Sequence, residues 1–236
     1  MWTLGIETSG RSGSVALLRD AEFVVERSLD RTGRRHAQTL LAEIDAMLRE
    51  YELSATDIGT IAVSVGPGSF TGLRVGIVCA KTFAYASGCQ LAAINTFQAI
   101  AENAPSHVSE LFVIADAQRQ DLFVGRFCRV DGNFALQGEI EIHPAAKWCA
   151  ARRESDLVSG PGVKKWSESL SSVCQVLPES GFDPQAQVVA ALGAKQTVEG
   201  SSADPWALEP LYLRRSSAED RWNARTSSKA IPGQNT

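Results

Sequence analysis

The segment GPGSFTGLRVG at residues 66–76 lies between an expected strand at 58–65 and an expected helix at about 70–87. Glycines on either side of Pro67 can adopt positive φ, and Ser69 is a natural N-cap for the helix. A glycine-rich turn before a helix can bind a phosphate through its amides. This one lacks the lysine of a Walker A loop, so a purely structural turn is the alternative. The candidate anion-binding residues are Gly66, Gly68, Ser69 and Thr71.

The helix expected after this turn carries small residues at every fourth position. They are Gly72, Gly76, Ala80, Ala84 and Gly88. A glycine inside a helix costs about 1 kcal/mol relative to alanine, so a close contact must compensate. Small residues let another element approach the helix axis closely. This small-residue ridge packs either against the chain's own sheet or against a partner helix, and the sequence leaves both open.

On the N-terminal side, alternating apolar residues predict strands at 2–7, 14–18 and 22–29, joined by short turns as an antiparallel meander. A helix at 35–51 follows, with one apolar face at helical spacing. This helix is a plausible neighbour of the ridge, so we predict that the two helices together present a partner interface. The predicted interface residues are Gly72, Leu73, Arg74, Gly76, Ile77, Ala80, Ala84, Leu40, Ile44 and Met47.

On the C-terminal side, a short strand and a short helix capped by Thr96 lead to Pro105 and Ser106, which suggest a lobe boundary. The second half starts again with strands. The further elements are expected at 111–115, 121–130, 134–142, 145–153, 157–159, 174–177 and 185–198. We therefore predict an N-terminal lobe at 1–104, a C-terminal lobe at 105–214 and a disordered tail at 215–236.

Composition limits the classes of protein to which the chain can belong. The formal net charge is −4 and the pI is about 5.5, which argues against a stand-alone nucleic-acid binder. Five cysteines without a C-x-x-C pair are typical of free thiols in a reducing compartment. No signal-peptide pattern and no membrane-length apolar run are visible. We expect a cytoplasmic protein that does not contact a membrane.

The motifs of common catalytic sites are missing. The three histidines, His36, His107 and His143, form neither H-E-x-x-H nor any other i, i+4 metal pair, and G-x-S-x-G is absent. We therefore predict no catalytic residue and no metal site. Two acids near strand ends, Glu7 and Asp116, stay as the groups on which any chemistry of this chain would depend.

Four segments carry a family resemblance. GPGSFTGLRVGI at 66–77, LGIETS at 4–9, DAQRQ at 116–120 and EPLYLR at 209–214 resemble the TsaB (YeaZ) family, so that the match runs from about residue 4 to residue 214. The resemblance implies an α/β protein with the actin-like ATPase (ASKHA, ribonuclease H-like) fold, with two lobes of mixed sheet and flanking helices. The family usually has aspartate at position 7, and the longer Glu7 argues against direct nucleotide chemistry.

The resemblance also implies a function and a set of partners. It implies a non-catalytic dimerisation and scaffold subunit required for threonylcarbamoylation of the adenosine next to the anticodon of tRNA. The implied partners are the catalytic subunit TsaD, the ATPase TsaE and, when alone, a second copy, with tRNA reached only through the complex. No intrinsic cofactor is implied, and ATP would enter the assembled complex. The alternative is a stand-alone nucleotide hydrolase or glycoprotease-like peptidase that uses the 66–71 loop with Glu7 and Asp116.

Overall fold

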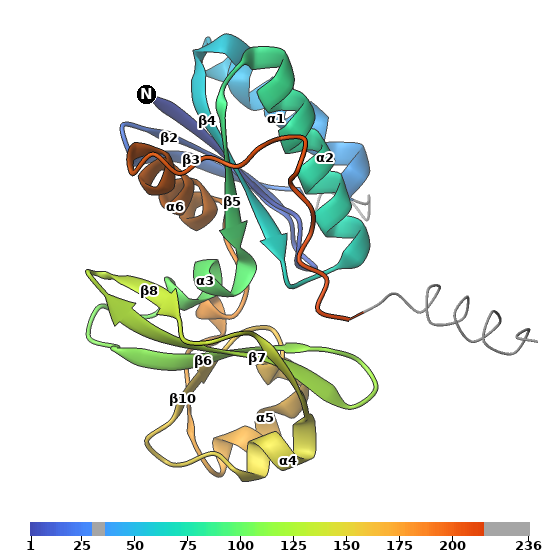
Figure 1. The fold of residues 1–236 in the computed structure, drawn as a ribbon, viewed down its shortest axis with the longest axis vertical. Helices are drawn as coiled ribbons and strands as arrows, with labels where there is room; N and C mark the ends of the chain where they lie inside the picture. Colours follow the sequence, from blue (N-terminus) through green and yellow to red (C-terminus); the bar gives the residue numbers. More distant parts are fainter. Residues whose placement is uncertain (30–35, 215–236) are drawn as a thin grey trace, which may run out of the picture.

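The computed structural model describes residues 1–29 and 36–214, which form two lobes, each built around one mixed sheet (Figure 1). No helix within these ranges combines the length and the apolar content that crossing a bilayer requires. The tail at 215–236, for which we predicted disorder, lies outside the described residues.

The sheet of the first lobe has the strand order β3-β2-β1-β4-β5. The first three strands form the predicted antiparallel meander, and β1-β4 and β4-β5 are parallel pairs. The strands are β1 (Trp2–Glu7), β2 (Ser14–Arg19), β3 (Glu22–Ser28), β4 (Ile58–Gly66) and β5 (Gln90–Asn95).

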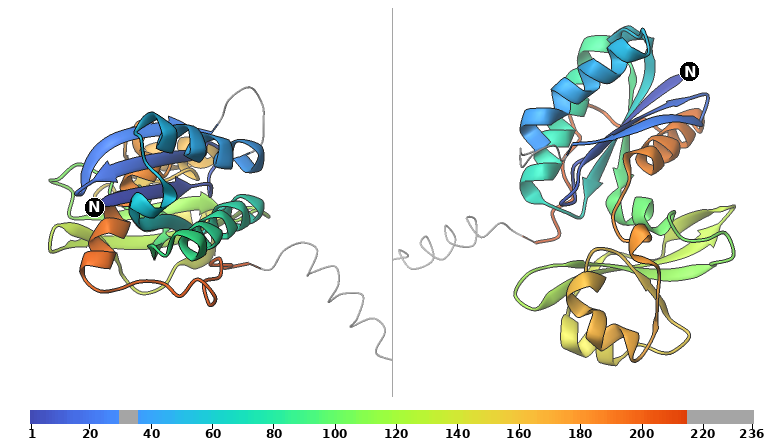
Figure 2. Two further views of the ribbon diagram at one scale, coloured as in Figure 1. Left: turned by 90° about the horizontal axis from the view of Figure 1, so that it is seen from above. Right: turned by 180° about the vertical axis from the view of Figure 1, so that it is seen from behind.

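Helices cover both faces of this sheet (Figure 2). Helices α1 (His36–Glu50) and α2 (Phe70–Ser87) lie on one face, where Leu4 and Ile6 of β1 join their core. Helix α6 (Ala186–Val198) packs on the other face, where Gly5 of β1 meets the helix backbone. Because side chains alternate between two covered faces, β1 is buried almost throughout, although its sequence alternates between apolar and other residues.

The second lobe repeats this plan. Its sheet order is β11-β10-β6-β7-β8, in which β11-β10 and β10-β6 are parallel pairs and β6-β7 and β7-β8 are antiparallel pairs. The similarity of plan between the lobes is therefore confirmed. The expected strand at 134–142 is divided into β8 and β9, and β9 also pairs with β7. The strands are β6 (Glu110–Asp116), β7 (Asp121–Val130), β8 (Asn133–Leu136), β9 (Glu141–Pro144), β10 (Leu157–Ser159) and β11 (Gln175–Val176).

Short helices complete the second lobe and its junction. They are α3 (Thr96–Ala101), α4 (Ala145–Ala150) and α5 (Val163–Ser171). Asn95, and not Thr96, is the N-cap of α3, because its side chain accepts from the next amides. The sequence did not predict α5, which is short, buries only two residues and is interrupted at Trp166. A second Gly-Pro-Gly turn, at 160–162, precedes it as 66–68 precedes α2.

The predicted lobe boundaries are wrong at both ends of the second lobe. Helix α6, placed in that lobe by sequence, packs on the first sheet through Val189, which contacts Ala62 and Ala92. Conversely, Phe97 and Ile100 of α3 lie in the core of the second lobe. A sheet with two apolar faces needs covering on both, and here the chain covers the second face by returning after the other lobe has formed.

Candidate docking face and lobe junction

The small-residue ridge of α2 faces the chain's own sheet. A Cβ added at Gly72 would lie under 3.0 Å from the carbonyl oxygen of Thr8, just after β1, and one at Gly76 would meet the Thr8 side chain. The Thr8 hydroxyl donates a hydrogen bond of 2.8 Å to the carbonyl of Gly72. The strand end therefore occupies the groove that the ridge leaves. Of the two alternatives that the sequence left open, the ridge packs on the chain's own sheet, and our prediction that its residues belong to a partner interface is wrong.

Most of the predicted interface residues are consequently buried. Of the ten, only Arg74 is exposed, and the others belong to the core: Leu40, Ile44, Met47, Gly72, Leu73, Gly76, Ile77, Ala80 and Ala84. The spacing of small residues shows which side of a helix another element approaches closely, but it does not identify that element. Substitutions such as Ala80→Arg would disturb folding before they could report on an interface.

The outward side of the same two helices carries a different surface, which we call the α1–α2 groove. It has a volume of about 640 Å³ and is mainly apolar. Leu41 and Val78 on its rim are 69% and 62% exposed, which is unusual for side chains gathered in one place. The lining residues are Leu40, Leu41, Arg74, Val75, Val78, Cys79, Thr82, Phe83 and Ala86. The sequence analysis missed this face, although a second, mainly apolar stripe on α2 at positions 75, 78, 79 and 82–83 could have indicated it.

The thiol of Cys79 belongs to the apolar lining of the groove. Burial raises the pKa of Cys79 to about 11, so the thiol stays protonated at neutral pH. A protonated, partly buried thiol is a poor nucleophile. Cys79 is therefore a packing residue of the groove and not a candidate nucleophile.

The Gly-Pro-Gly turn packs against the loop after β1. The Ser69 amide donates to the carbonyl of Ser9 at 2.7 Å, and the Ser69 hydroxyl accepts from the Gly72 amide at 3.2 Å, as expected for an N-cap. A Cβ at Gly68 would lie 2.7 Å from atoms of Ser9, and Gly66 has φ +119°. Close packing and positive φ thus account for the glycines. Anion binding at Gly66, Gly68, Ser69 and Thr71 stays a prediction, and the amides of Gly66, Ser69 and Gly72 are already paired within the chain.

Glu7 is enclosed within the first lobe. It is 0% exposed, and its Oε1 accepts from the amide and the hydroxyl of Ser9 at 2.5 and 2.6 Å. The hydroxyl of Ser64 donates to its Oε2. Burial raises the pKa of Glu7, and these hydrogen bonds lower it to a smaller extent. Both carboxyl oxygens are therefore engaged by the chain itself.

Asp116 takes part in a separate network on the surface. Its carboxylate accepts from the Gln118 amide at 2.9 Å and pairs with Lys165 at 3.0 Å. This is the arrangement of an Asx turn that ends a strand. Among the described residues, no three His, Cys, Asp or Glu side chains gather as metal ligands would.

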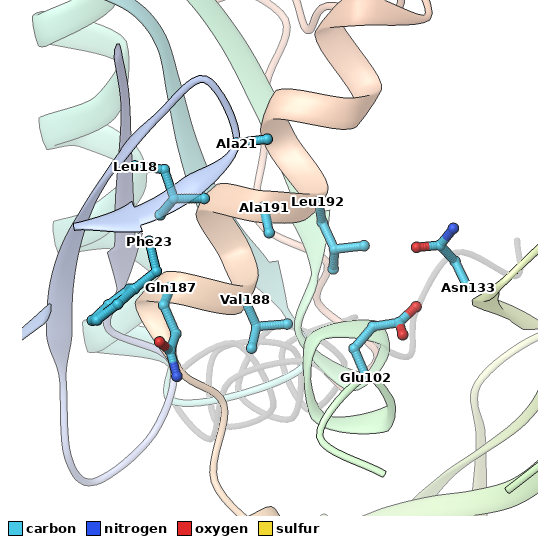
Figure 3. Close-up of a pocket in the computed structure, with 9 residues that line it drawn as sticks. All are labelled: Leu18, Ala21, Phe23, Glu102, Asn133, Gln187, Val188, Ala191 and Leu192. Carbon is cyan, nitrogen blue, oxygen red and sulfur yellow. The ribbon is translucent and has the colours of Figure 1, made fainter. Parts of the chain in front are cut away.

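A second hollow lies behind α6, between the β2–β3 turn and the second lobe (Figure 3). It has a volume of about 320 Å³, and its acid, Glu102, accepts from the Phe134 amide at 2.6 Å and lies 3.6 Å from Arg129. Because Glu102 is already paired, this hollow offers no reactive group that would define a site.

The last described segment, residues 203–214, which we call the strap, ties the lobes together (Figure 1). Its Leu211 amide donates to the carbonyl of Val65 in the first lobe at 2.7 Å. Three residues later, Arg214 donates to the carbonyl of Ala117 at 2.7 Å and to the Asp121 carboxylate at 2.5 Å in the second lobe. The segments 66–72, 116–120 and 209–214, which carry the family resemblance, therefore meet at one junction.

Arg214 supports a strained turn. Gln118, Arg119 and Gln120 have consecutive φ values of 62°, 52° and 64°, and left-handed conformations cost about 1–2 kcal/mol per residue. Arg214 contacts two carbonyls of this turn and the carboxylate at its end. Strain of this kind persists only where the surrounding contacts hold it.

We expect Arg214→Ala to release this turn. Loss of the charge-assisted hydrogen bonds should lower the free energy of unfolding by about 1–3 kcal/mol. Hydrogen–deuterium exchange of the 117–121 amides should become faster, while exchange in β1 and β4 of the first lobe should change little. Arg214→Lys is the matched control, because lysine keeps the positive charge but lacks the planar guanidinium group that contacts several acceptors at once. Unchanged exchange at 117–121 in Arg214→Ala would show that the turn holds its own conformation.

Comparisons with known proteins match this arrangement over most of the chain. The family model of TsaD, tRNA N6-adenosine threonylcarbamoyltransferase, matches residues 30–199. A TsaB protein of Haemophilus influenzae is 32% identical, and the alignment covers 98% of this chain and 97% of that protein. The chain belongs to the TsaB family.

Solved structures identify the fold of this TsaB-family chain. A Pseudomonas aeruginosa protein with similarity to peptidase YEAZ is 25% identical, with a TM-score of 0.77 over 90% of this chain and 99% of that one. A ROK hexokinase of Thermus thermophilus is 10% identical, with a TM-score of 0.50 over 85% of this chain and 100% of that one. The chain has the actin-like ATPase fold, as the sequence resemblance implied.

Proposed function

We propose that this chain is a non-catalytic scaffold subunit in the threonylcarbamoylation of the adenosine next to the anticodon of tRNA. The observation that carries the proposal is the exposed apolar α1–α2 groove, which suits a helical partner. The TsaB protein of H. influenzae bears the name of a tRNA threonylcarbamoyladenosine biosynthesis protein, which supports the process to which we assign the chain.

The partner that fits the groove best is TsaD. The TsaD family model matches residues 30–199, a range that contains both α1 and α2, so TsaD is expected to carry a similar helix pair. Two related helix pairs can associate about an approximate two-fold axis, as identical surfaces do in a dimer. A second copy of the chain could use the same face when TsaD is absent. We place TsaE, ATP and tRNA in the assembled complex, and we assign this chain no cofactor of its own. We expect the complex to be cytoplasmic.

The hydrogen bonds and ion pairs of Glu7 and Asp116 favour a supporting role over a catalytic one. Both carboxyl oxygens of Glu7 are bound within the chain, and Asp116 is paired with Lys165. The alternative, a stand-alone nucleotide hydrolase or peptidase, requires these groups to be available. The isolated folded chain should therefore turn over neither ATP nor a peptide, and a turnover that Gly68→Val abolishes would support the alternative.

The groove is tested by Val78→Lys. Val78 is largely exposed, so the substitution should leave folding within about 0.5 kcal/mol of wild type. A lysine in an apolar interface and near Arg74 should weaken binding to TsaD at least about 100-fold. Calorimetric titration with TsaD of the same organism and threonylcarbamoylation of tRNA by the reconstituted complex provide the measurements.

The matched control is Val198→Lys, which adds the same charge at another exposed valine, at the end of α6. We expect wild-type affinity and activity from it. Wild-type affinity in Val78→Lys would show that TsaD docks elsewhere, and the proposal for the groove would fail.

A further inference from the structure

Two large aromatic side chains stand exposed beside the α1–α2 groove. Tyr85 of α2 is 72% exposed and Trp206 of the strap is 78% exposed. Their rings contact edge to face, with centroids 5.6 Å apart and an interplanar angle of 74°. Isolated exposed apolar residues are ordinary, but a paired tyrosine and tryptophan next to an apolar groove form a patch that calls for an explanation.

The chain holds Trp206 in place before any partner arrives. The Trp206 amide donates to the Asp204 carboxylate at 2.8 Å, and the Leu208 amide donates to the Asp204 carbonyl at 3.0 Å, which closes a tight turn. On one side of this turn the Ala203 amide donates to the carbonyl of Leu91, and on the other Lys81 of α2 donates to the carbonyl of Leu208. The exposed tryptophan is thus built on an ordered segment, which reduces the entropy that binding would cost.

The aromatic pair lies on the same side of α2 as two of the residues that line the groove. Tyr85 lies three positions after Thr82 and seven after Val78, which places the three side chains on one side of the helix. Val78 and Thr82 line the groove, and Trp206 extends the same surface onto the strap. Exposed apolar side chains therefore lie on α1, α2 and the strap: Leu41 and Val78 line the groove, and Tyr85 and Trp206 lie toward the C-terminal end of α2.

We propose that Tyr85 and Trp206 are a second anchor for TsaD at the end of the α1–α2 groove. This inference rests on the proposed function and adds the strap to the docking face. Aromatic side chains each bury about 150–250 Å² when covered. Together they would add about 300–500 Å² to a groove contact, against about 800 Å² per partner in a standard interface. Tryptophan and tyrosine are also the residues most often found as binding hot spots.

The partner surface that fits this anchor is an apolar helix end with hydrogen-bond acceptors at its rim. The rings supply apolar area, and the indole N–H and the phenol supply polar tips. We choose TsaD as the partner because the TsaD family model matches residues 30–199, which contain α1 and α2. If two related helix pairs dock on each other, a helix of TsaD is brought toward the C-terminal end of α2.

The test is titration of full-length Trp206→Ala with TsaD of the same organism. We expect binding about tenfold weaker than wild type, with an unchanged melting temperature because the side chain is largely exposed. Tyr85→Ala should show a similar loss, and the double variant should lose less than the product of the two, because the rings act together. Trp206→Phe, which keeps an aromatic ring, should recover most of the affinity.

The outcomes separate this inference from the proposed function. If Val78→Lys abolishes binding and Trp206→Ala binds as wild type does, the groove stands and the aromatic anchor is wrong. If Val78→Lys binds normally, the proposed groove fails, and a loss in Trp206→Ala would still place TsaD on the strap. If Trp206→Ala weakens only self-association, measured by analytical ultracentrifugation, the anchor serves a second copy of the chain and our assignment to TsaD is overturned.

Discussion

Gly72→Ala is expected to lower the free energy of unfolding by about 3 kcal/mol. The added Cβ would lie under 3.0 Å from the carbonyl oxygen of Thr8, and a backbone atom cannot rotate away as a side chain can. Gly76→Ala should cost less, because the nearest atom there is the side-chain hydroxyl of Thr8. That hydroxyl donates to the carbonyl of Gly72, so moving it gives up one hydrogen bond, worth about 1 kcal/mol.

Urea denaturation of the purified variants measures this effect. Gly10→Ala is the matched control, because the nearest atoms to a Cβ at that position lie 3.6 Å away, an ordinary contact. We expect the control to lie within about 0.5 kcal/mol of wild type. A Gly72→Ala variant as stable as this control would mean that α2 does not press on the end of β1, and the assignment of the ridge to the chain's own sheet would fail.

Glu7→Gln is expected to remove the pH dependence that the buried acid imposes on stability. Burial raises the pKa of Glu7 above its ordinary value of 4.5 in the folded chain. The folded state then favours the protonated acid, so this contribution to stability is complete below pH 4.5 and is lost as pH rises toward the raised pKa. The slope in that window is up to about 1.4 kcal/mol per pH unit. Glutamine does not ionise and should show no such loss.

The measurement is the unfolding free energy of wild type and Glu7→Gln at several values between pH 5 and pH 8. The stability of the variant relative to wild type should rise with pH until the raised pKa of Glu7 is reached, and it should stay constant above that pH. Glu110→Gln is the control, because Arg126 lowers the pKa of Glu110 and so moves its titration below this range. Its difference from wild type should stay constant. Parallel curves for wild type and Glu7→Gln would contradict a raised pKa for Glu7.

Local patterns predicted most of the secondary structure. Alternation predicted β1 to β3 and their meander, and apolar spacing predicted α1 to within one residue at each end. The helices expected at 70–87 and 185–198 also agree with α2 and α6 to within one residue. Ser69 acts as the predicted N-cap, because capping depends only on residues within one turn. The missed helix α5 has few buried residues, so its pattern was too weak to distinguish it from a loop.

The sequence by itself determined most of the elements, their order and the family that the chain resembles. It also showed that one side of α2 must be approached closely, since small residues recur there at every fourth position. Only the tertiary structure decided that β1 approaches that side, that α6 returns to the first sheet, and that the exposed face of α1 and α2 is the opposite one. The physical reason is that periodicity is a local property, whereas the partner of a buried face comes from a distant part of the chain and depends on the path that the chain takes between them.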